Sequence, residues 1–277
     1  NMGIGQICWN PRVWMDMVTF GWSVEADIVP GLTDCLVLWG TNPAQSDNSA
    51  FWRHIRAYAE GEGALVVVDP RRTEAAALAD VWLPVRPGTD AVLALGLLNV
   101  IIGERLYDAS FVDAWCSGFD ELARAVAPLA PEAVAVTCGV PADDIRRAAR
   151  LFATGRASAL VSGRGIDQIG AAVAPTHRAL CCLRAITGNV DKPGACVLAE
   201  APDFTSELAM EMSDAMPASC RAAALGPYRT PLQSYAGYDA LRALTERLGR
   251  TPPMRYLTSA HPDLVLRAME EGRPYPI

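Results

Sequence analysis

Short apolar runs alternate along this chain with longer segments in which apolar residues recur every three or four positions. Each run is apolar at nearly every position and is followed within two residues by Gly, Pro or Asp; the runs span residues 34–39, 64–68, 81–85 and 159–162. Strands of a parallel sheet have this pattern because helices cover both of their faces. The alternation of strands with helical segments therefore predicts an α/β fold.

The segments between these runs carry signals for the start of helices. Polar residues offer N-caps for a helix over 49–60, and Thr89 or Asp90 can cap an apolar helix over 90–104. Another helix is expected over 171–186. The helix over 49–60 joins the first two strands into a βαβ unit, so we expect a Rossmann-like open sheet, mostly parallel, with helices on both faces.

The pattern divides the chain into three parts. Residues 1–30, rich in Trp, Met and Gly, predict an active-site loop and a short helix; residues 31–200 predict the Rossmann-like cofactor-binding domain. Residues 201–277 have weak periodicity, with short amphipathic helices expected at 239–248 and 262–271. We expect this last part to lead into a second α/β domain, and the chain to be a fragment of a longer protein.

Composition excludes several classes of protein. The chain has 277 residues, 51% of them hydrophobic, with 24 Lys and Arg against 31 Asp and Glu. This acidic balance, without a basic stripe, argues against a nucleic-acid partner. The longest apolar stretch, residues 92–102, is far shorter than the roughly 20 residues of a membrane span. A globular domain that binds neither nucleic acid nor membrane is expected.

The rarer residues exclude further chemistry. Lys192 is the single lysine, which removes a phosphate-binding Gly-Lys-Ser/Thr loop and makes Schiff-base catalysis improbable. The three histidines are widely spaced, and the eight cysteines contain no Cys-x-x-Cys pair, so neither a zinc knuckle nor an iron–sulfur run is indicated. We expect His54 to be a surface or packing residue and the adjacent Cys181 and Cys182 to be core residues. For His177, in a helix behind the loop at 163–165, a secondary role at the site in that loop stays open.

The loops that come after the predicted strands are the candidate binding site. In an open parallel sheet these loops share one edge, where ligands bind. Asp69 and Asp90 each place a carboxylate there, and a carboxylate can accept the two donors of a guanine edge. Asp90 is equally well explained as a helix cap. The Gly-x-Gly at 163–165 lacks the third glycine of a dinucleotide fingerprint, so NAD binding is not predicted.

Several spaced motifs give this chain a family resemblance. LWGTNP at 38–43, VVDPRRT at 67–73 and ADVWLPVRPGTD at 79–90 resemble, in order and spacing, the molybdopterin oxidoreductases of the dimethyl sulfoxide reductase family. LYDASFV at 106–112, GVPADDI at 139–145 and TGNVDKPG at 187–194 continue the resemblance, and GRPYPI at 272–277 is similar to the segment that leads into a neighbouring domain.

The resemblance implies a bis(molybdopterin guanine dinucleotide) cofactor with molybdenum or tungsten. In cysteine-ligated members the protein ligand precedes the first Gly-x-Asn-Pro segment and is followed by a proline and a glycine. Cys8, with Pro11 and Gly21 after it, fits that position and is the candidate metal ligand. The alternative is a buried free cysteine in an ordinary loop. A [4Fe-4S] cluster is expected only upstream of this chain.

The same resemblance assigns the remaining candidate site residues. The pyrophosphate or pterin would be lined by Gly40, Thr41 and Asn42. The guanosine pocket would consist of Asp69, Arg71, Gly88 and Asp90. The pterin core and the metal would be approached by Gly163, Gly165 and Gln168.

Two departures from the family bear on the substrate. In formate dehydrogenases a histidine follows the metal ligand, whereas this chain has Trp9. Formate dehydrogenases also carry an arginine shortly after the Thr-Gly-Asn segment, whereas residues 195–203 of this chain include no basic residue. Formate is therefore not expected as substrate. Trp9 would form an aromatic wall that suits an uncharged or aromatic small molecule, although core packing explains it equally well.

The prediction is thus a cofactor-binding fragment of an oxidoreductase that moves two electrons between a small-molecule substrate and an iron–sulfur electron-transfer subunit. Two alternatives within the fold stay open: a non-redox hydratase of the same family, and a scaffold without metal like the large iron–sulfur subunit of respiratory complex I. A third alternative, the central domain of a thiamine diphosphate enzyme, lacks a Gly-Asp-Gly motif here.

Overall fold

The computed structural model describes residues 8, 10–21, 23–47, 50–61, 63–169, 172–198, 215, 217–223, 243, 246–247 and 262–273. The chain divides into two compact units. One is formed by Cys8–Ala199, and the other by Asn1–Ile7 with Glu200–Ile277. The first unit contains the sheet and every residue of the candidate site.

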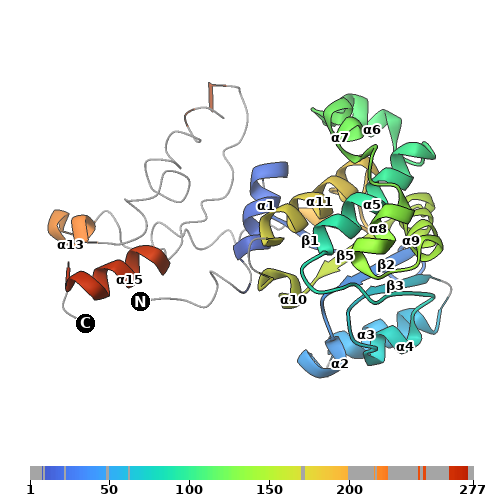
Figure 1. Cartoon of the computed structure of the whole chain (residues 1–277), viewed down its shortest axis with the longest axis horizontal. Helices are drawn as coiled ribbons and strands as arrows, with labels where there is room; N and C mark the ends of the chain where they lie inside the picture. Colours follow the sequence, from blue (N-terminus) through green and yellow to red (C-terminus); the bar gives the residue numbers. More distant parts are fainter. Residues whose placement is uncertain are drawn as a thin grey trace. The chain divides into compact units, whose positions relative to one another are not determined.

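A four-stranded parallel sheet forms the centre of the first unit (Figure 1). Its strands lie in the order β4 (Val81–Leu83), β3 (Ala64–Val68), β2 (Cys35–Trp39) and β5 (Ser158–Ser162). Trp39 is paired with Val68 on one side and with Ser162 on the other, so three strands end at the same level. The α/β class and the parallel sheet predicted from the sequence are confirmed.

Alternate residues of the strands enter two separate cores. Val37, Trp39 and Val66 face one core, while Leu36, Leu38 and Leu65 face the other. Every residue of β2 is buried. This explains why the strand is apolar without a gap, as the sequence pattern suggested.

Helices cover both faces of the sheet (Figure 1). The smaller core packs against α3 (Ala50–Ala59) and α4 (Glu74–Leu78). The larger core is covered by α5 (Asp90–Gly103), α8 (Pro131–Cys138), α9 (Ala142–Thr154) and α11 (Val173–Ile186). Further helices in this unit are α2 (Pro43–Ser46), α6 (Ala109–Trp115), α7 (Phe119–Val126) and α10 (Arg164–Asp167).

Two short elements at the start of the unit connect with its end. Helix α1 (Asn10–Phe20) packs on α11, and strand β1 (Val24–Ala26) pairs antiparallel with β6 (Cys196–Leu198). The sequence predicted the short helix but neither of these strands. The division of the chain at residues 30 and 200 stays a prediction.

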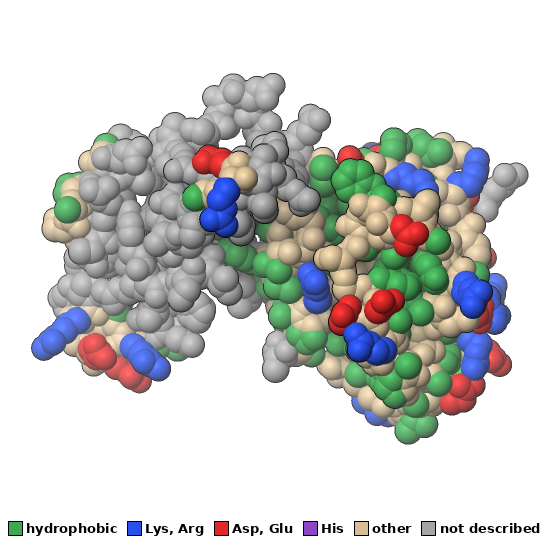
Figure 2. Space-filling model, turned by 90° about the horizontal axis from the view of Figure 1, so that it is seen from above, with side chains coloured by type: hydrophobic (Ala, Val, Ile, Leu, Met, Phe, Trp, Pro, Cys, Tyr) green, Lys and Arg blue, Asp and Glu red, His purple; other side chains and the backbone are tan. Residues whose placement is uncertain are grey.

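The surface of the first unit carries mixed charges. On the face that Figure 2 presents, basic and acidic side chains are interspersed, and Arg150 makes a two-pronged ion pair with Glu104 at 2.8 Å. Among the described helices, none is long and apolar enough to span a membrane. In the second unit the structure describes α13 (Ala218–Ala223) and α15 (Pro262–Glu271); α15 coincides with the helix predicted over 262–271, and most of the helix predicted over 239–248 lies outside the described residues.

The apolar helix α5 offers a matched test of packing. A Cβ at Gly96 would meet the Val134 methyl carbons at 2.9 Å, whereas a Cβ at Gly103 would meet nothing within 4 Å. Gly96→Ala should therefore destabilise the protein by about 1–3 kcal/mol through overpacking. Gly103→Ala, in the same helix, should be neutral or stabilising by up to about 1 kcal/mol. Thermal unfolding of both variants tests this packing; equal melting temperatures would contradict it.

Candidate functional site

Two loops meet at the carboxyl edge of the sheet. The Gly163 N–H donates to the Trp39 carbonyl at 2.8 Å, and the Gly165 N–H donates to the Gly40 carbonyl at 3.1 Å. A Cβ at Gly163 would lie 2.3 Å from the Gly40 oxygen and 2.4 Å from Thr41 Cβ. Glycine is required at 163 because the two loops touch, whether or not a ligand also approaches. The structure thus brings together four of the predicted pterin-side residues.

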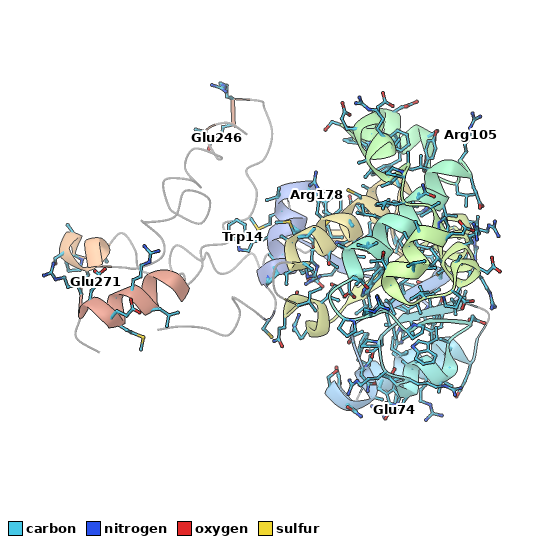
Figure 3. The ribbon with its side chains drawn as sticks, viewed as in Figure 1. Trp14, Glu74, Arg105, Arg178, Glu246 and Glu271 are labelled. Carbon is cyan, nitrogen blue, oxygen red and sulfur yellow. The ribbon has the colours of Figure 1, made fainter. Side chains whose placement is uncertain are left out.

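A groove of about 450 Å³ opens beside this contact, at the ends of β2 and β3. The predicted residues Asn42 and Arg71 line it, together with Gln45, Arg72, Thr73, Glu74 and Ala77. The Asn42 amide donates to Glu74 Oε2 at 3.1 Å across the groove. Glu74 lies at the outer edge of α4 (Figure 3), and the Thr73 hydroxyl caps that helix by accepting from the Ala76 N–H.

Electrostatics in the groove are set by its one described carboxylate and two arginines. The pKa of Glu74 is lowered, first because its carboxylate accepts from its own backbone N–H and then because it accepts from Asn42. Glu74 is therefore ionised at neutral pH. Arg71 is largely exposed, with its Nε 3.9 Å from Asp69 Oδ1, and Arg72 is exposed beside it. Exposed guanidinium groups of this kind can pair with a ligand phosphate.

One acceptor atom in this groove is unsatisfied. Asn42 Oδ1 is buried and has no hydrogen-bond partner. A buried acceptor without a donor is costly unless a ligand supplies one. An N–H-bearing heterocycle such as a guanine or a pterin would supply that donor, while Arg71 and Arg72 would face its phosphates. The residues present at this edge fit a molybdopterin guanine dinucleotide.

The two predicted guanine-binding carboxylates lie at the same edge but are turned inward. Asp69 is 5% exposed, and its Oδ1 accepts from the Arg71 N–H at 2.8 Å. Asp90 is 4% exposed, and its Oδ1 accepts from the buried Trp39 indole N–H at 2.9 Å. Asp90 therefore holds the last residue of β2, a role that the sequence did not indicate. The Thr89 hydroxyl does not cap α5 but donates to the Arg86 carbonyl.

The remaining predicted pocket residues lie in turns at this edge. Gly88 is in the turn before α5 with φ of +86°. Gln168 is exposed and ends α10, the single turn that comes after Gly163. Just before it, Asp167 lies 2.7 Å from His177 Nε2, and both side chains are 2% exposed. His177 thus attaches the loop over 163–168 to α11.

Cys8 is half-buried and lies two residues before the first residue of α1. The unpaired N–H groups at a helix N-terminus favour an anionic ligand such as a thiolate. Trp9 lies outside the described residues. The structure records no contact that joins Cys8 to the loops at the sheet edge, so its role as metal ligand stays a prediction.

The other expectations about histidines and cysteines can be compared with the structure directly. All eight cysteines lie among the described residues and are free thiols. Burial raises the pKa of Cys181 to about 12, so this thiol stays protonated and donates to Asp16. His54 is half-buried with Nε2 3.1 Å from the Ile28 carbonyl. These residues are packing residues, as expected, but His177 has the buried partner described above.

Sequence reasoning missed Glu74, Asp167 and the buried pair Asp16–Arg184. For Glu74 a signal existed, because it comes directly after the N-cap residue Thr73 at a predicted strand end. The other residues resemble ordinary polar positions of amphipathic helices, and their partners lie on different elements.

Comparison with known proteins places this geometry in a family. The sequence profile described as "Molybdopterin oxidoreductase" matches residues 20–252. Acetylene hydratase of Syntrophotalea acetylenica is 34% identical over 247 residues, which cover 88% of this chain and 34% of that protein. Formate dehydrogenase H of Escherichia coli strain K12 is 37% identical over 163 residues, which cover 59% of this chain and 22% of that protein.

A solved structure agrees with these matches. Acetylene hydratase from Pelobacter acetylenicus superposes with a TM-score of 0.85 at 33% sequence identity, over 99% of this chain and 38% of that one. The chain thus spans about a third of the length of the acetylene hydratase that it matches. The match to the profile overturns the alternative of a thiamine diphosphate enzyme domain, which lacked its own motif.

The contact between Asp90 and Trp39 gives a test of what Asp90 does. Asp90→Ala leaves the buried indole N–H without an acceptor and should destabilise the protein by about 1–3 kcal/mol. Asp90→Asn keeps an acceptor oxygen at the same place and should retain most of that stability. Thermal unfolding of the two variants measures the difference. If both variants unfold like the wild type and differ only in bound guanine nucleotide, the contact with Trp39 is not what Asp90 provides.

Proposed function

The chain belongs to the molybdopterin oxidoreductase family, and from that premise we propose that it is the cofactor-binding part of an enzyme that hydrates an uncharged, unsaturated small molecule. Family membership implies a bis(molybdopterin guanine dinucleotide) cofactor with molybdenum or tungsten. The reaction is the finer part of the proposal. It concerns the whole enzyme. If that enzyme is as long as acetylene hydratase, this chain is about a third of it.

The extent of the likeness to acetylene hydratase carries the choice of reaction. That likeness covers 88% of this chain in sequence and 99% in structure. The likeness to formate dehydrogenase H covers 59%. A two-electron oxidoreductase was the main prediction from the sequence, and the comparisons favour the hydratase that stood beside it as an alternative.

The residues of this chain would hold the cofactor and orient it. Asn42 would accept a hydrogen bond from a heterocycle in the groove, and Arg71 would neutralise phosphate charge. Gly40 and Gly163 would bring backbone close to the pterin, and Cys8 would be the protein ligand of the metal. When bound, the metal centre supplies Lewis-acid or redox chemistry. Trp9 beside Cys8 suits a substrate without charge.

A redox enzyme is the second candidate function, supported by the likeness to formate dehydrogenase H. The two candidates differ in what they require. Adding water to an unsaturated bond transfers no electrons to a partner, whereas an oxidoreductase must pass two electrons to another centre. If the enzyme is an oxidoreductase, we propose an iron–sulfur subunit as its partner. For both candidate functions we propose a [4Fe-4S] cluster outside this chain.

The first experiment uses the full-length protein, purified without air. We expect about one molybdenum or tungsten and about two acid-released GMP per chain, the stoichiometry of a bis-dinucleotide cofactor. Acetylene should be hydrated without any electron acceptor. Cys8→Ser should lower the hydration rate by at least the roughly 10- to 100-fold that loss of an outer-shell partner costs, because Cys8 is proposed as the ligand itself. Cys220→Ser, at an exposed cysteine of the second unit, is the matched control and should behave like the wild type.

Other outcomes would redirect the proposal. Reduction of a dye by a small substrate, with no hydration, would favour the redox candidate. If the wild-type protein contains neither metal nor GMP, the proposal is wrong and the remaining candidate is a scaffold like the complex I subunit.

A further inference from the structure

Helix α1 begins at Asn10, two residues after the candidate metal ligand Cys8. Because a single residue separates Cys8 from the helix, a shift of α1 along its neighbour would displace Cys8 as well. The neighbour is α11, against which α1 packs. Any positioning role of α1 toward a metal rests on the proposed function, because it takes Cys8 as the ligand.

One face of α1 is held by polar contacts on successive turns. Arg12, Asp16 and Thr19 are spaced by four and three residues and therefore share a face. Arg12 makes a two-pronged ion pair with Glu25 at 2.6 and 3.0 Å and donates to the Val24 carbonyl. Thr19 accepts from Arg178 of α11 at 2.6 Å, and Arg178 lies beside α1 in Figure 3.

The central contact is a fully buried ion pair. Arg184 of α11 donates to Asp16 Oδ1 at 2.6 Å, with side-chain exposures of 4% and 0%. The Cys181 thiol donates to the same oxygen at 3.3 Å, and the Val24 N–H donates to Oδ2 at 3.4 Å. The Arg184 guanidinium also lies over the Phe20 ring, 5.4 Å from its centroid. Both oxygens of Asp16 are thus used, and its position is determined from three sides.

Stability alone does not account for such a pair. Replacing a buried ion pair by apolar residues of similar volume is often neutral or stabilising, because desolvation offsets the attraction. The ion pair adds a geometric constraint. Apolar side chains tolerate sliding of one helix along another, whereas the charged hydrogen bond between Arg184 and Asp16 is formed at only one position of α1 along α11. A contact of this kind can therefore set the position of one helix on another.

The other end of α11 has a second buried polar contact. His177 binds Asp167 at 2.7 Å and so holds the loop over 163–168, which the family resemblance assigns to the pterin. Arg164, itself half-exposed, lies 3.7 Å from the other oxygen of Asp167. One helix therefore holds both the segment after Cys8 and the predicted pterin-facing loop.

We propose that α11 sets the distance between the metal ligand Cys8 and the pterin-facing loop, with Asp16–Arg184 and Asp167–His177 as its two positioning pairs. Neither pair touches the substrate. Each acts by fixing the register of an element that contributes to the site.

The test replaces the charge pair by apolar residues in the full-length protein. The variant D16L/R184M should keep the GMP content of the wild type, since burial is preserved. Its melting temperature should fall only modestly, because the Val24 N–H and the Cys181 thiol lose Asp16 as their acceptor. Amide hydrogen exchange of residues 10–20, measured by mass spectrometry on cofactor-free protein, should be faster by about tenfold or more, while exchange in the strands is unchanged. Alkylation of Cys8 in the same samples should become faster.

In the loaded enzyme the same variant should lose the protein sulfur ligand, counted by X-ray absorption at the metal edge. Its kcat should fall roughly 10- to 100-fold with KM little changed. E104Q/R150Q, which removes the exposed ion pair between α5 and α9, is the matched control and should change none of these readings.

Three results separate the possibilities. Wild-type exchange and alkylation rates in D16L/R184M would overturn the positioning role. If that variant does not fold, Asp16→Asn, which keeps the shape of the side chain, must show the faster exchange. A wild type without metal or GMP would end the proposed function, while exchange and alkylation in the cofactor-free protein would still decide whether the pair holds Cys8 in place.

Discussion

The burial of one five-residue strand on both faces is the constraint on which this structure depends. β2 lies between β3 and β5, so its side chains must be apolar at every position and supply two cores at once. Its last residue, Trp39, is fully buried and bound to Asp90. The loop over 40–42 begins directly after this residue. It supplies Asn42 to the groove and the Gly40 carbonyl to the contact with the second loop.

The central fold could be predicted because its strands and helices each have a clear local pattern of apolar and polar residues. The strand predicted at 64–68 is observed as Ala64–Val68, and the helix expected over 90–104 is observed as Asp90–Gly103. The elements that were missed are very short. β1 and β6 have three residues each. Unlike β4, which is as short but lies within the predicted run over 81–85, each of them is a strand only because the other pairs with it from far along the chain.

The candidate site was predicted in its residue types but not in the directions of its side chains. Gly163 was expected beside a ligand, and the structure shows a protein contact that already requires a glycine there. Asp90 was expected to face a ligand or cap a helix, yet its carboxylate is turned toward Trp39. Neither outcome can be read from a linear sequence, because both depend on which loop lies opposite. Asp16 and Arg184 escaped notice for the same reason.

The pairing of β1 with β6 has a consequence for the order in which this protein is made. Residues 24–26 find their partner strand only when residues 196–198 have been synthesised, and Asp16 must likewise wait for Arg184. Chains emerge from the ribosome N-terminus first, at about 5–20 residues per second. For roughly 10 to 30 seconds the segment after Cys8 is therefore without the contacts that hold it. If Cys8 is the metal ligand, as proposed, the protein side of that site is complete only after the whole first unit has been translated.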